Sequence, residues 1–472
     1  MRSLQVFLER CGRKRPLVPD QSAERLLAPP RRLEIILKEE TSLAEIIREK
    51  DFLPILETNA QAFFASCNTF LENKIDKINK RIIGHLHEES ELLVSFLDDY
   101  NARNNKVFAY FSEIVACIRN LIRVCYLQRH ILRRYFKYHL DDDVAQVAQF
   151  HLSSGESFEF LINSLTELAK EVYREAREVL GLKIKHKVIE RLNLPDPIPK
   201  STLPDDITED LIANPEQPIV EISTVYLKAA KEIASISEVD RDSPNEIKDF
   251  VTLEIPEERV RNLEATVHGL QSKYDTHVKG TRVELKDETL LKLRGHISMA
   301  LHLLEYTTGL VHFYERHETD IRSVEAKRGI ARLVDKNEIL RLIVNYGFHY
   351  ARLYIMRGQP YAEILIKQHT VTIKMDLTLP EGLYLHARPV TLIVSIVHHH
   401  GMPVQMEIEG EKVEANSIIQ LLMACGGNHK TRKVTFYGDE KPLNDLKALF
   451  EARLGENGPD SLPPSLHYLK KV

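Results

Sequence analysis

The chain has 472 residues, of which 43% are hydrophobic and 28% are charged, and its formal net charge is −5. This length exceeds what one ordinary hydrophobic core organises, so we expect two or three domains. The 64 Lys and Arg residues nearly balance the 69 Asp and Glu residues. The net charge therefore does not indicate a basic surface that would bind nucleic acid. No apolar run is long enough to cross a bilayer, and we therefore expect no membrane span.

The cysteines are scattered and odd in number, which predicts reduced thiols rather than a disulfide framework or a zinc site. They are Cys11, Cys67, Cys117, Cys125 and Cys425. The basic residues near the start, Arg2 and those at 13–15, are not followed by the apolar core of a signal peptide. Both observations predict a cytoplasmic protein.

Before residue 365, apolar residues recur at steps of three and four, which predicts long amphipathic helices. The clearest stripes are Val107, Phe111, Ile114, Ile118, Leu121 and Cys125; Phe158, Leu161, Leu165, Leu168, Val172, Ala176 and Val179; and Leu290, Leu293, Ile297, Leu301, Leu304 and Val311. Each stripe needs an apolar partner, so we expect an all-α helical bundle, with a homodimer through these helices as one candidate assembly. Asp141, Asp142 and Asp143 suit a helix N-terminus, where acids favour the dipole.

A cluster of prolines interrupts this helical pattern at Pro195, Pro197, Pro199, Pro204, Pro215 and Pro218. Because helix cannot continue through so many prolines, we predict a semi-rigid linker or a long surface crossover at 191–220. It separates a helical region at 1–190 from another at 221–365, which form either two domains or one bundle. Neither region contains a phosphate-binding loop, a nucleophile elbow or a paired-metal motif.

After residue 370 the pattern changes to short strands and helices. Residues 371–377, 404–408 and 433–437 alternate apolar and polar side chains, which is typical of strands. Residues 387–400 and 443–454 read as helices, each followed by a glycine. Glu409-Gly410-Glu411 marks a tight turn between two short strands, and a short helix is expected before the last strand. The predicted order is therefore βαββαβα, an α+β domain over 370–455 with an open sheet and helices on one face, followed by a tail at 456–472.

The run Leu385-His386-Ala387-Arg388-Pro389 lies where an extended segment turns into a helix. Proline fits a first helical turn because the N–H it lacks would have no intrahelical partner, and this places His386 at the N-cap. The free N–H groups there and the fork of donors on Arg388 favour an anion. We therefore predict a site that holds a phosphoryl group on His386. The alternative is an imidazole that merely caps backbone groups.

These residues carry a family resemblance. The segment from about Thr370 to Gly455 resembles HPr, the histidine-containing phosphocarrier protein of the bacterial phosphoenolpyruvate-dependent phosphotransferase system. The shared features are the Leu-His-Ala-Arg-Pro run and the later sequence Val-Glu-Ala-Asn-Ser-Ile-Ile at 413–419, with the family's spacing between His386 and Ser417. The resemblance implies an open-faced βαββαβα sandwich, with His386 as the phosphoacceptor through Nδ1 and Ser417 as a regulatory phosphoserine. For Ser417 the alternative is a helix-capping serine.

The resemblance also implies partners. The phosphoryl donor would be an enzyme I-type protein charged by phosphoenolpyruvate, and the downstream acceptor is a protein of unknown identity. Ile418, Ile419 and Leu422 would dock a partner or belong to the core, and we expect a mixture. No cofactor or metal is implied, and the adjacent imidazoles at 398–400 point about 100° apart along a helix, which does not suit one ion.

Two positions depart from the family pattern. Tyr384 stands directly before the Leu-His pair, where the family usually has glycine, and Gln420 replaces another common glycine. The sequence thus supports two hypotheses. The first is a phosphoryl carrier, rather than a turnover enzyme, that relays or senses phosphorylation of His386 in phosphotransferase-linked regulation. The second is a degenerate HPr-like docking module that never accepts phosphate.

Overall fold

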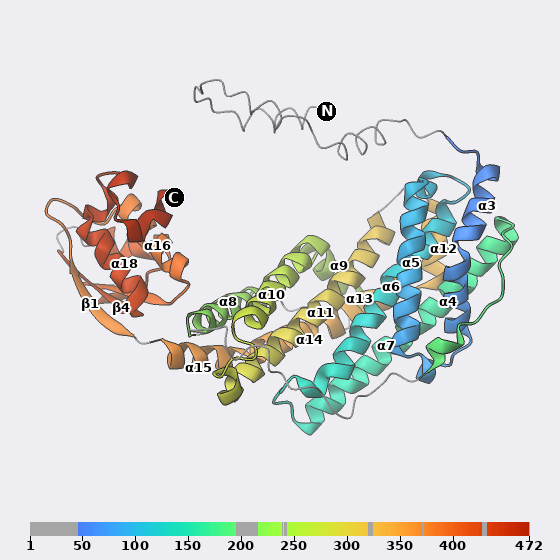
Figure 1. Cartoon of the computed structure of the whole chain (residues 1–472), viewed down its shortest axis with the longest axis horizontal. Coiled ribbons are helices and arrows are strands. Elements are labelled where there is room, and N and C mark those ends of the chain that lie inside the picture. Colours follow the sequence, from blue (N-terminus) through green and yellow to red (C-terminus); the bar gives the residue numbers. More distant parts are fainter. Residues whose placement is uncertain are drawn as a thin grey trace, which may run out of the picture. The chain divides into compact units, whose positions relative to one another are not determined.

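The computed structural model describes residues 46–194, 216–237, 239, 243–319, 324–370, 372–426 and 432–471. Within them the chain is helical up to His369 and then forms a small antiparallel sheet with helices (Figure 1). Parts of several predicted segments lie outside the described residues. They are 1–45 of the first helical region, including Cys11; 195–215 of the Pro-rich segment; 238, 240–242 and 320–323 of the second helical region; Val371 of the first predicted strand; and Val472 of the predicted tail.

The helical region contains thirteen described α-helices. These are α3 (Glu49–Asn59), α4 (Gln61–Leu71), α5 (Lys80–Asp99), α6 (Ala109–Arg134), α7 (Val144–Arg174), α8 (Glu216–Ala234), α9 (Pro244–Leu253), α10 (Glu257–His277), α11 (Glu288–Thr319), α12 (Val324–Leu333), α13 (Lys336–Arg341), α14 (His349–Arg357) and α15 (Gln359–His369). Two π-helical turns, Glu175–Val179 and Leu342–Phe348, continue α7 and precede α14.

The three predicted apolar stripes lie on α6, α7 and α11, and their residues are buried with two exceptions. Val107 precedes the start of α6 and is 42% exposed. Val179 is 57% exposed because the chain widens into a π-helical turn after α7, which rotates this residue off the stripe. Pro218 was predicted to lie in the linker but belongs to α8. It is tolerated there because the N–H groups of a first helical turn have no intrahelical partner.

The helices before and after the Pro-rich segment share one core. α6 packs along α11, and two buried hydroxyl pairs join α7 to the later part of the chain. Ser157 Oγ lies 2.7 Å from Tyr306 Oη, and Ser154 Oγ lies 2.9 Å from Tyr346 Oη. The two helical regions therefore bury their stripes against each other.

The acidic run before α7 has two roles. Asp143 is the N-cap of α7 and forms a reciprocal capping box with Gln146, so the predicted helix N-terminus is confirmed. Asp142 turns inward instead, and only 3% of its side chain is exposed. Its carboxylate accepts hydrogen bonds from Tyr135, Arg357 and, at 2.8 Å, the hydroxyl of Tyr354. This buried acid holds the start of α7 to α14.

The C-terminal domain has the predicted order βαββαβα. Its elements are β1 (Ile373–Thr378), α16 (Ala387–His400), β2 (Val404–Ile408), β3 (Glu411–Glu414), α17 (Ile418–Gly426), β4 (Lys433–Gly438) and α18 (Glu440–Glu451). The strands pair antiparallel in the order β1-β4-β2-β3, with Phe436 of the central strand opposite both Met375 and Met406. Alternate residues of β2 and β4 are buried in the domain core together with residues of α16, α17 and α18.

The boundaries of the two longer helices follow from their caps. Gly401, with φ +65°, ends α16 in the left-handed conformation, as predicted. α18 begins at Glu440, earlier than the predicted Leu443, because the side chain of Asp439 caps it by accepting a hydrogen bond from the N–H of Lys441. The chain then turns through Arg453–Gly455.

The segment predicted as a tail packs into this domain. It forms a 3-10 helix at Pro464–Lys471, and Leu462, Leu466 and Leu469 are buried in the same core as α16 and α18. We call residues 456–472 the C-terminal extension. It is part of the surroundings of the predicted site.

Candidate functional site

His386 is presented at the start of α16. Its backbone is extended, with φ −121°, and its carbonyl accepts the N–H of Val390 at 3.1 Å, which makes it the N-cap. The flanking Leu385 and Pro389 are buried, so they anchor the chain on both sides of the histidine. The imidazole makes no capping hydrogen bond, and 37% of its side chain is exposed. The ring is therefore held in place but remains accessible, and the alternative of a merely capping imidazole is not supported.

The first turn of α16 offers donors to an anion beside this ring. Pro389 has no N–H and Val390 bonds to His386, so the N–H groups of Ala387 and Arg388 are those without intrahelical partners. Arg388 is exposed, and no hydrogen bond or ion pair to the described residues engages its guanidinium. Two backbone N–H groups and the guanidinium of Arg388 are thus available to an anion at the positive end of the helix dipole.

A carboxylate that the sequence analysis missed lies on the other side of the ring. Glu456 Oε1 is 3.2 Å from His386 Nε2, but the N–H direction is not that of a hydrogen bond. This oxygen is buried and accepts no hydrogen bond from the described part of the chain. Glu456 follows Gly455 in the turn after α18, outside both motifs of the HPr resemblance.

Tyr384, the first departure from the family pattern, lies beside the imidazole. The two ring centroids are 5.1 Å apart with an interplanar angle of 59°, and Tyr384 is 52% exposed. The tyrosine therefore flanks the histidine without covering it.

Ser417 stands at the start of α17, which packs against α16. Its Oγ accepts the N–H of Gln420 at a long 3.4 Å, and the Gln420 side chain accepts the N–H of Glu414 at 3.3 Å. Gln420, the second departure, thus holds the segment before the helix. These contacts agree with the capping alternative for Ser417.

The predicted docking residues divide between surface and core, as expected. Ile418 and Ile419 are 40% and 71% exposed, whereas Leu422 is partly buried against the domain core. Met423, which was not predicted, is 74% exposed. We call Ile418, Ile419 and Met423 the α17 face.

The imidazoles at the end of α16 diverge. The ring of His399 stacks on Tyr468, with centroids 3.7 Å apart, and His400 Nε2 lies 2.8 Å from Asp445 Oδ2. Tyr468 also donates its hydroxyl to Asp445 at 2.7 Å. These contacts attach the C-terminal extension to α16 and α18. Across the described ranges, no group of three or more His, Cys, Asp or Glu side chains is arranged to hold a metal ion.

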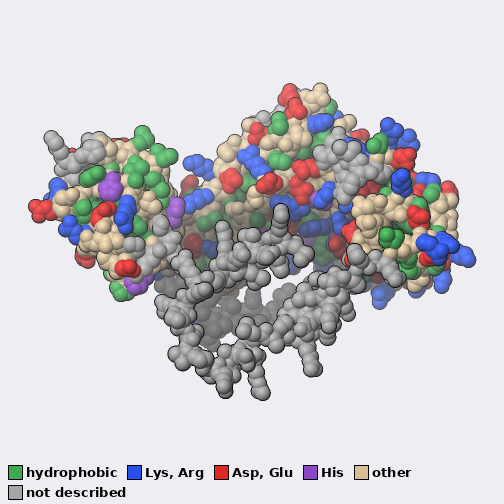
Figure 2. Space-filling view, turned by 90° about the horizontal axis from the view of Figure 1, so that it is seen from above, with side chains coloured by type: hydrophobic (Ala, Val, Ile, Leu, Met, Phe, Trp, Pro, Cys, Tyr) green, Lys and Arg blue, Asp and Glu red, His purple; other side chains and the backbone are tan. Residues whose placement is uncertain are grey.

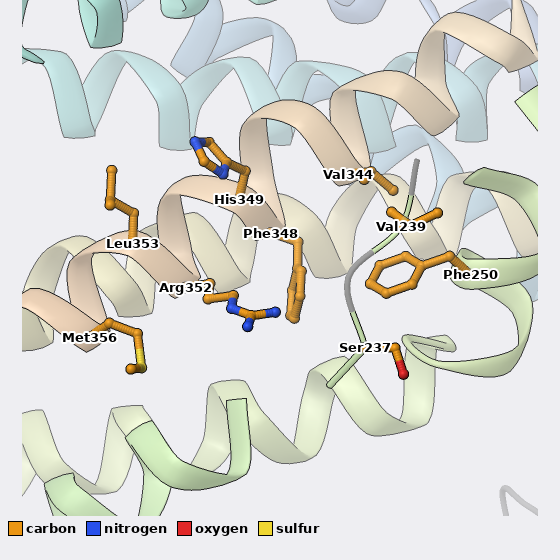
Figure 3. Close-up of a pocket in the computed structure, with 9 residues that line it drawn as sticks. All are labelled: Ser237, Val239, Phe250, Val344, Phe348, His349, Arg352, Leu353 and Met356. Carbon is orange, nitrogen blue, oxygen red and sulfur yellow. The ribbon is translucent and has the colours of Figure 1, made fainter. Parts of the chain in front are cut away.

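The helical region contains a pocket of about 240 Å³ between the end of α8, α9 and α14 (Figure 3). Its lining is mainly apolar and includes Phe250, Val344 and Phe348. Arg352 also lines it and donates hydrogen bonds to the carbonyls of Ile236 at 3.0 Å and Ala234 at 3.4 Å. The guanidinium therefore holds the end of α8, and Ser237 and His349 add polar groups to the lining of the pocket.

Basic and acidic side chains are interspersed over the face drawn in Figure 2. Of the helices that the structure describes, none combines the length and the apolar character that crossing a membrane requires.

The comparisons with known proteins concern the C-terminal domain. A family model described as the PTS HPr component phosphorylation site matches residues 371–452. No curated protein and no solved structure matches the chain significantly. The match spans the βαββαβα unit, including His386, Arg388 and Ser417, and it indicates a phosphocarrier-type role in the phosphotransferase system. Residues 371–452 are therefore an HPr domain, which lies at the C-terminus of a chain whose preceding region is helical.

Proposed function

We propose that this protein accepts a phosphoryl group on Nδ1 of His386 from the phosphohistidine of an enzyme I-type donor. The observation that carries the proposal is an accessible imidazole at a helix N-terminus, beside free N–H groups and an unengaged guanidinium. The acceptor atom is the one that the family uses, and the surrounding donors are suited to a phosphoryl anion.

The transfer needs placement more than covalent assistance. The lone pair of Nδ1 attacks the donor phosphorus, the donor's P–N bond breaks, and its electron pair returns to the donor imidazole. The N–H groups of Ala387 and Arg388 stabilise negative charge on the phosphoryl oxygens. The guanidinium of Arg388 clamps the same oxygens from an exposed position, so it can release them when an acceptor protein arrives.

The α17 face is the proposed docking surface for the donor and the downstream acceptor. It is apolar and exposed, and α17 packs on the helix that His386 caps. Phosphorylation of Ser417 would add a dianion at the start of α17 and change the charge of this surface. The serine would thereby regulate docking rather than the chemistry at His386.

The helical region makes a regulator the favoured role. It is several times longer than the HPr domain and has a continuous core of its own. A carrier that only shuttles phosphate for sugar uptake gains nothing from such an attachment. We propose that the phosphorylation state of His386 is relayed to, or sensed by, this region in phosphotransferase-linked regulation in the cytoplasm of a bacterium.

A second candidate function is a docking module without phosphotransfer. Tyr384 favours it, because its exposed ring flanks the imidazole and alters the approach of a donor. Under this alternative the α17 face still binds a partner, while His386 stays unmodified.

The two functions are separated by labelling the full chain with phosphoenolpyruvate, labelled in its phosphate, and enzyme I. The carrier predicts an acid-labile, base-stable label that is lost in His386→Ala. His398→Ala, which removes an exposed histidine of the same domain, keeps the label. If an ordinary HPr in the same mixture is labelled and this chain is not, the docking module is the correct function.

A further inference from the structure

The carboxylate of Glu456 meets the imidazole of His386 at Nε2, the nitrogen that does not receive the phosphoryl group under the proposed function. The two atoms are 3.2 Å apart. Glu456 Oε1 is buried and lacks a hydrogen-bond donor within the residues described. A buried acceptor without a donor is costly, so a rotation of the ring that aims Nε2–H at this oxygen is favourable.

The position of Glu456 is fixed by the turn that precedes it. Leu454 is fully buried, and a Cβ on Gly455 would come within 2.7 Å of Leu392 Cδ1 on α16. Gly455 also has φ +71°, which favours glycine. After the turn, Leu462 and Leu466 anchor the chain in the domain core. The family match ends at residue 452, so this carboxylate comes from the C-terminal extension rather than from the matched segment.

We infer that Glu456 is a positioning residue for phosphoryl transfer, which accepts Nε2–H of His386 and so keeps the lone pair of Nδ1 free. This inference rests on the proposed function. A neutral imidazole carries one N–H, and a carboxylate only accepts, so the pair favours the tautomer protonated at Nε2. Carboxylates hold the tautomer of functional histidines in the same way elsewhere.

The charge balance of the transfer gives Glu456 a second effect. When Nδ1 forms its bond to phosphorus, the ring keeps the proton on Nε2 and becomes cationic. The neighbouring carboxylate stabilises this positive charge. In the onward transfer the Nδ1–P bond breaks, its electron pair returns to Nδ1, and the ring leaves as neutral imidazole. No proton has to move in either direction. By stabilising the cationic ring Glu456 assists acceptance, and the proton that it holds on Nε2 lets the ring leave as a neutral imidazole in the onward transfer.

The test is Glu456→Gln in the full chain, which keeps the size of the side chain and removes its charge. Glu451→Gln, at an exposed glutamate at the end of α18, is the matched control. The maximum rate of labelling at saturating enzyme I should fall about fivefold in Glu456→Gln, since a charged acceptor is stronger than a neutral one. The half-saturating concentration of enzyme I should stay unchanged, because Glu456 is not on the α17 face.

A second readout does not require phosphorylation. In ¹⁵N spectra of histidine-labelled, unphosphorylated protein, wild type should show His386 protonated at Nε2, and Glu456→Gln should show a larger share of the Nδ1–H form. Equal tautomer populations and equal rates in the two proteins would overturn the inference. If the variant does not fold, a wild-type spectrum with mainly Nδ1–H would overturn it too. A wild-type chain that takes no label instead contradicts the proposed function, and the tautomer measurement still decides the role of Glu456.

Discussion

At the scale of single residues, the chemistry that we propose depends on a few side chains around the His386 ring. Leu385 and Pro389 bury themselves on either side of His386, which leaves the imidazole accessible at a helix end. Ser417 and Gln420, by contrast, are engaged in contacts that shape the start of α17. The polar side chains of the two motifs therefore differ in kind: His386 and Arg388 are exposed and available to a ligand, whereas Ser417 and Gln420 hold the backbone.

Arg388 should affect transfer without affecting stability. Its guanidinium is exposed and has no partner in the described part of the domain, so Arg388→Ala should remove only the proposed contact with the phosphoryl group. We expect the rate of labelling by enzyme I to fall about tenfold, which corresponds to roughly 1.4 kcal/mol for a charge-assisted hydrogen bond. The exposed Arg432 offers a matched control, and Arg432→Ala should leave the rate unchanged. Equal rates for both variants would remove Arg388 from the site.

His296 should make the helical region less stable in acid. Burial lowers its pKa to about 4, and its Nδ1 lies 2.9 Å from the carbonyl of Tyr354. The ordinary pKa of histidine is about 6.5, so below that pH the unfolded chain binds a proton that the folded chain refuses. The free energy of unfolding should therefore decrease from pH 6.5 down to pH 4, by roughly 3 kcal/mol for this residue.

Urea unfolding between pH 7 and pH 4.5, followed by circular dichroism, measures this dependence. His296→Asn should reduce the slope, whereas His268→Asn at an exposed position of α10 should not. The stability of His296→Asn should still depend on pH to some extent because of His130. Burial, together with the nearby His302, also lowers the pKa of His130 to about 4. A slope that is identical in wild type and His296→Asn would show that this imidazole takes up its proton as readily in the folded chain.

At the scale of elements, the sequence predicted most of the C-terminal domain because its signals are local. The helix Ala387–His400 and its cap at Gly401 follow from an apolar stripe and a glycine. The strand Val404–Ile408 follows from strict alternation. Glu456 could not be found in this way. It reaches His386 only because the packing of Leu454 and Gly455 on α16 folds the extension back, and such long-range packing leaves no periodic pattern in the sequence.

In the helical region, one glycine allows two elements to approach closely. A Cβ on Gly295 of α11 would lie 1.6 Å from the backbone oxygen of Tyr138, whereas a Cβ on Gly269 of α10 would meet nothing within 4 Å. Gly295→Ala should therefore lower the free energy of unfolding by about 3 kcal/mol, since a backbone atom must move. Gly269→Ala should raise it by about 0.5–1 kcal/mol through helix propensity. Urea unfolding of both variants measures the two changes in the free energy of unfolding. A destabilisation of the same size at both positions would contradict the close approach of Gly295 to the backbone of Tyr138.

At the scale of the whole molecule, the chain combines an HPr domain with a helical region that has its own continuous core. The sequence left open whether the helices on either side of the Pro-rich segment belong together. Buried tyrosine hydroxyls, such as Tyr306 against Ser157 and Tyr346 against Ser154, join them. Amphipathic stripes could not reveal this pairing, because an apolar face shows that a partner is needed but not which helix provides it.

The C-terminal extension should be required for a stable HPr domain. A stop after Gly455 removes Leu462, Leu466 and Leu469 from the core, and each buried leucine contributes about 1.5–3 kcal/mol. We expect hydrogen exchange in β2 and β4 of the shortened chain to be much faster than in wild type. Exchange in α6 and α11 serves as an internal reference and should not change. Unaltered protection in β2 and β4 would mean that the extension is dispensable for folding.

The central claim is that Nδ1 of His386 carries the phosphoryl group, and the most direct measurement is NMR of the full chain after incubation with phosphoenolpyruvate and enzyme I. In protein labelled with ¹⁵N-histidine, we predict ¹⁵N–³¹P coupling at Nδ1 of a single histidine, absent in His386→Ala. An unmodified spectrum under conditions that phosphorylate an ordinary HPr, or coupling at another histidine, would contradict the claim.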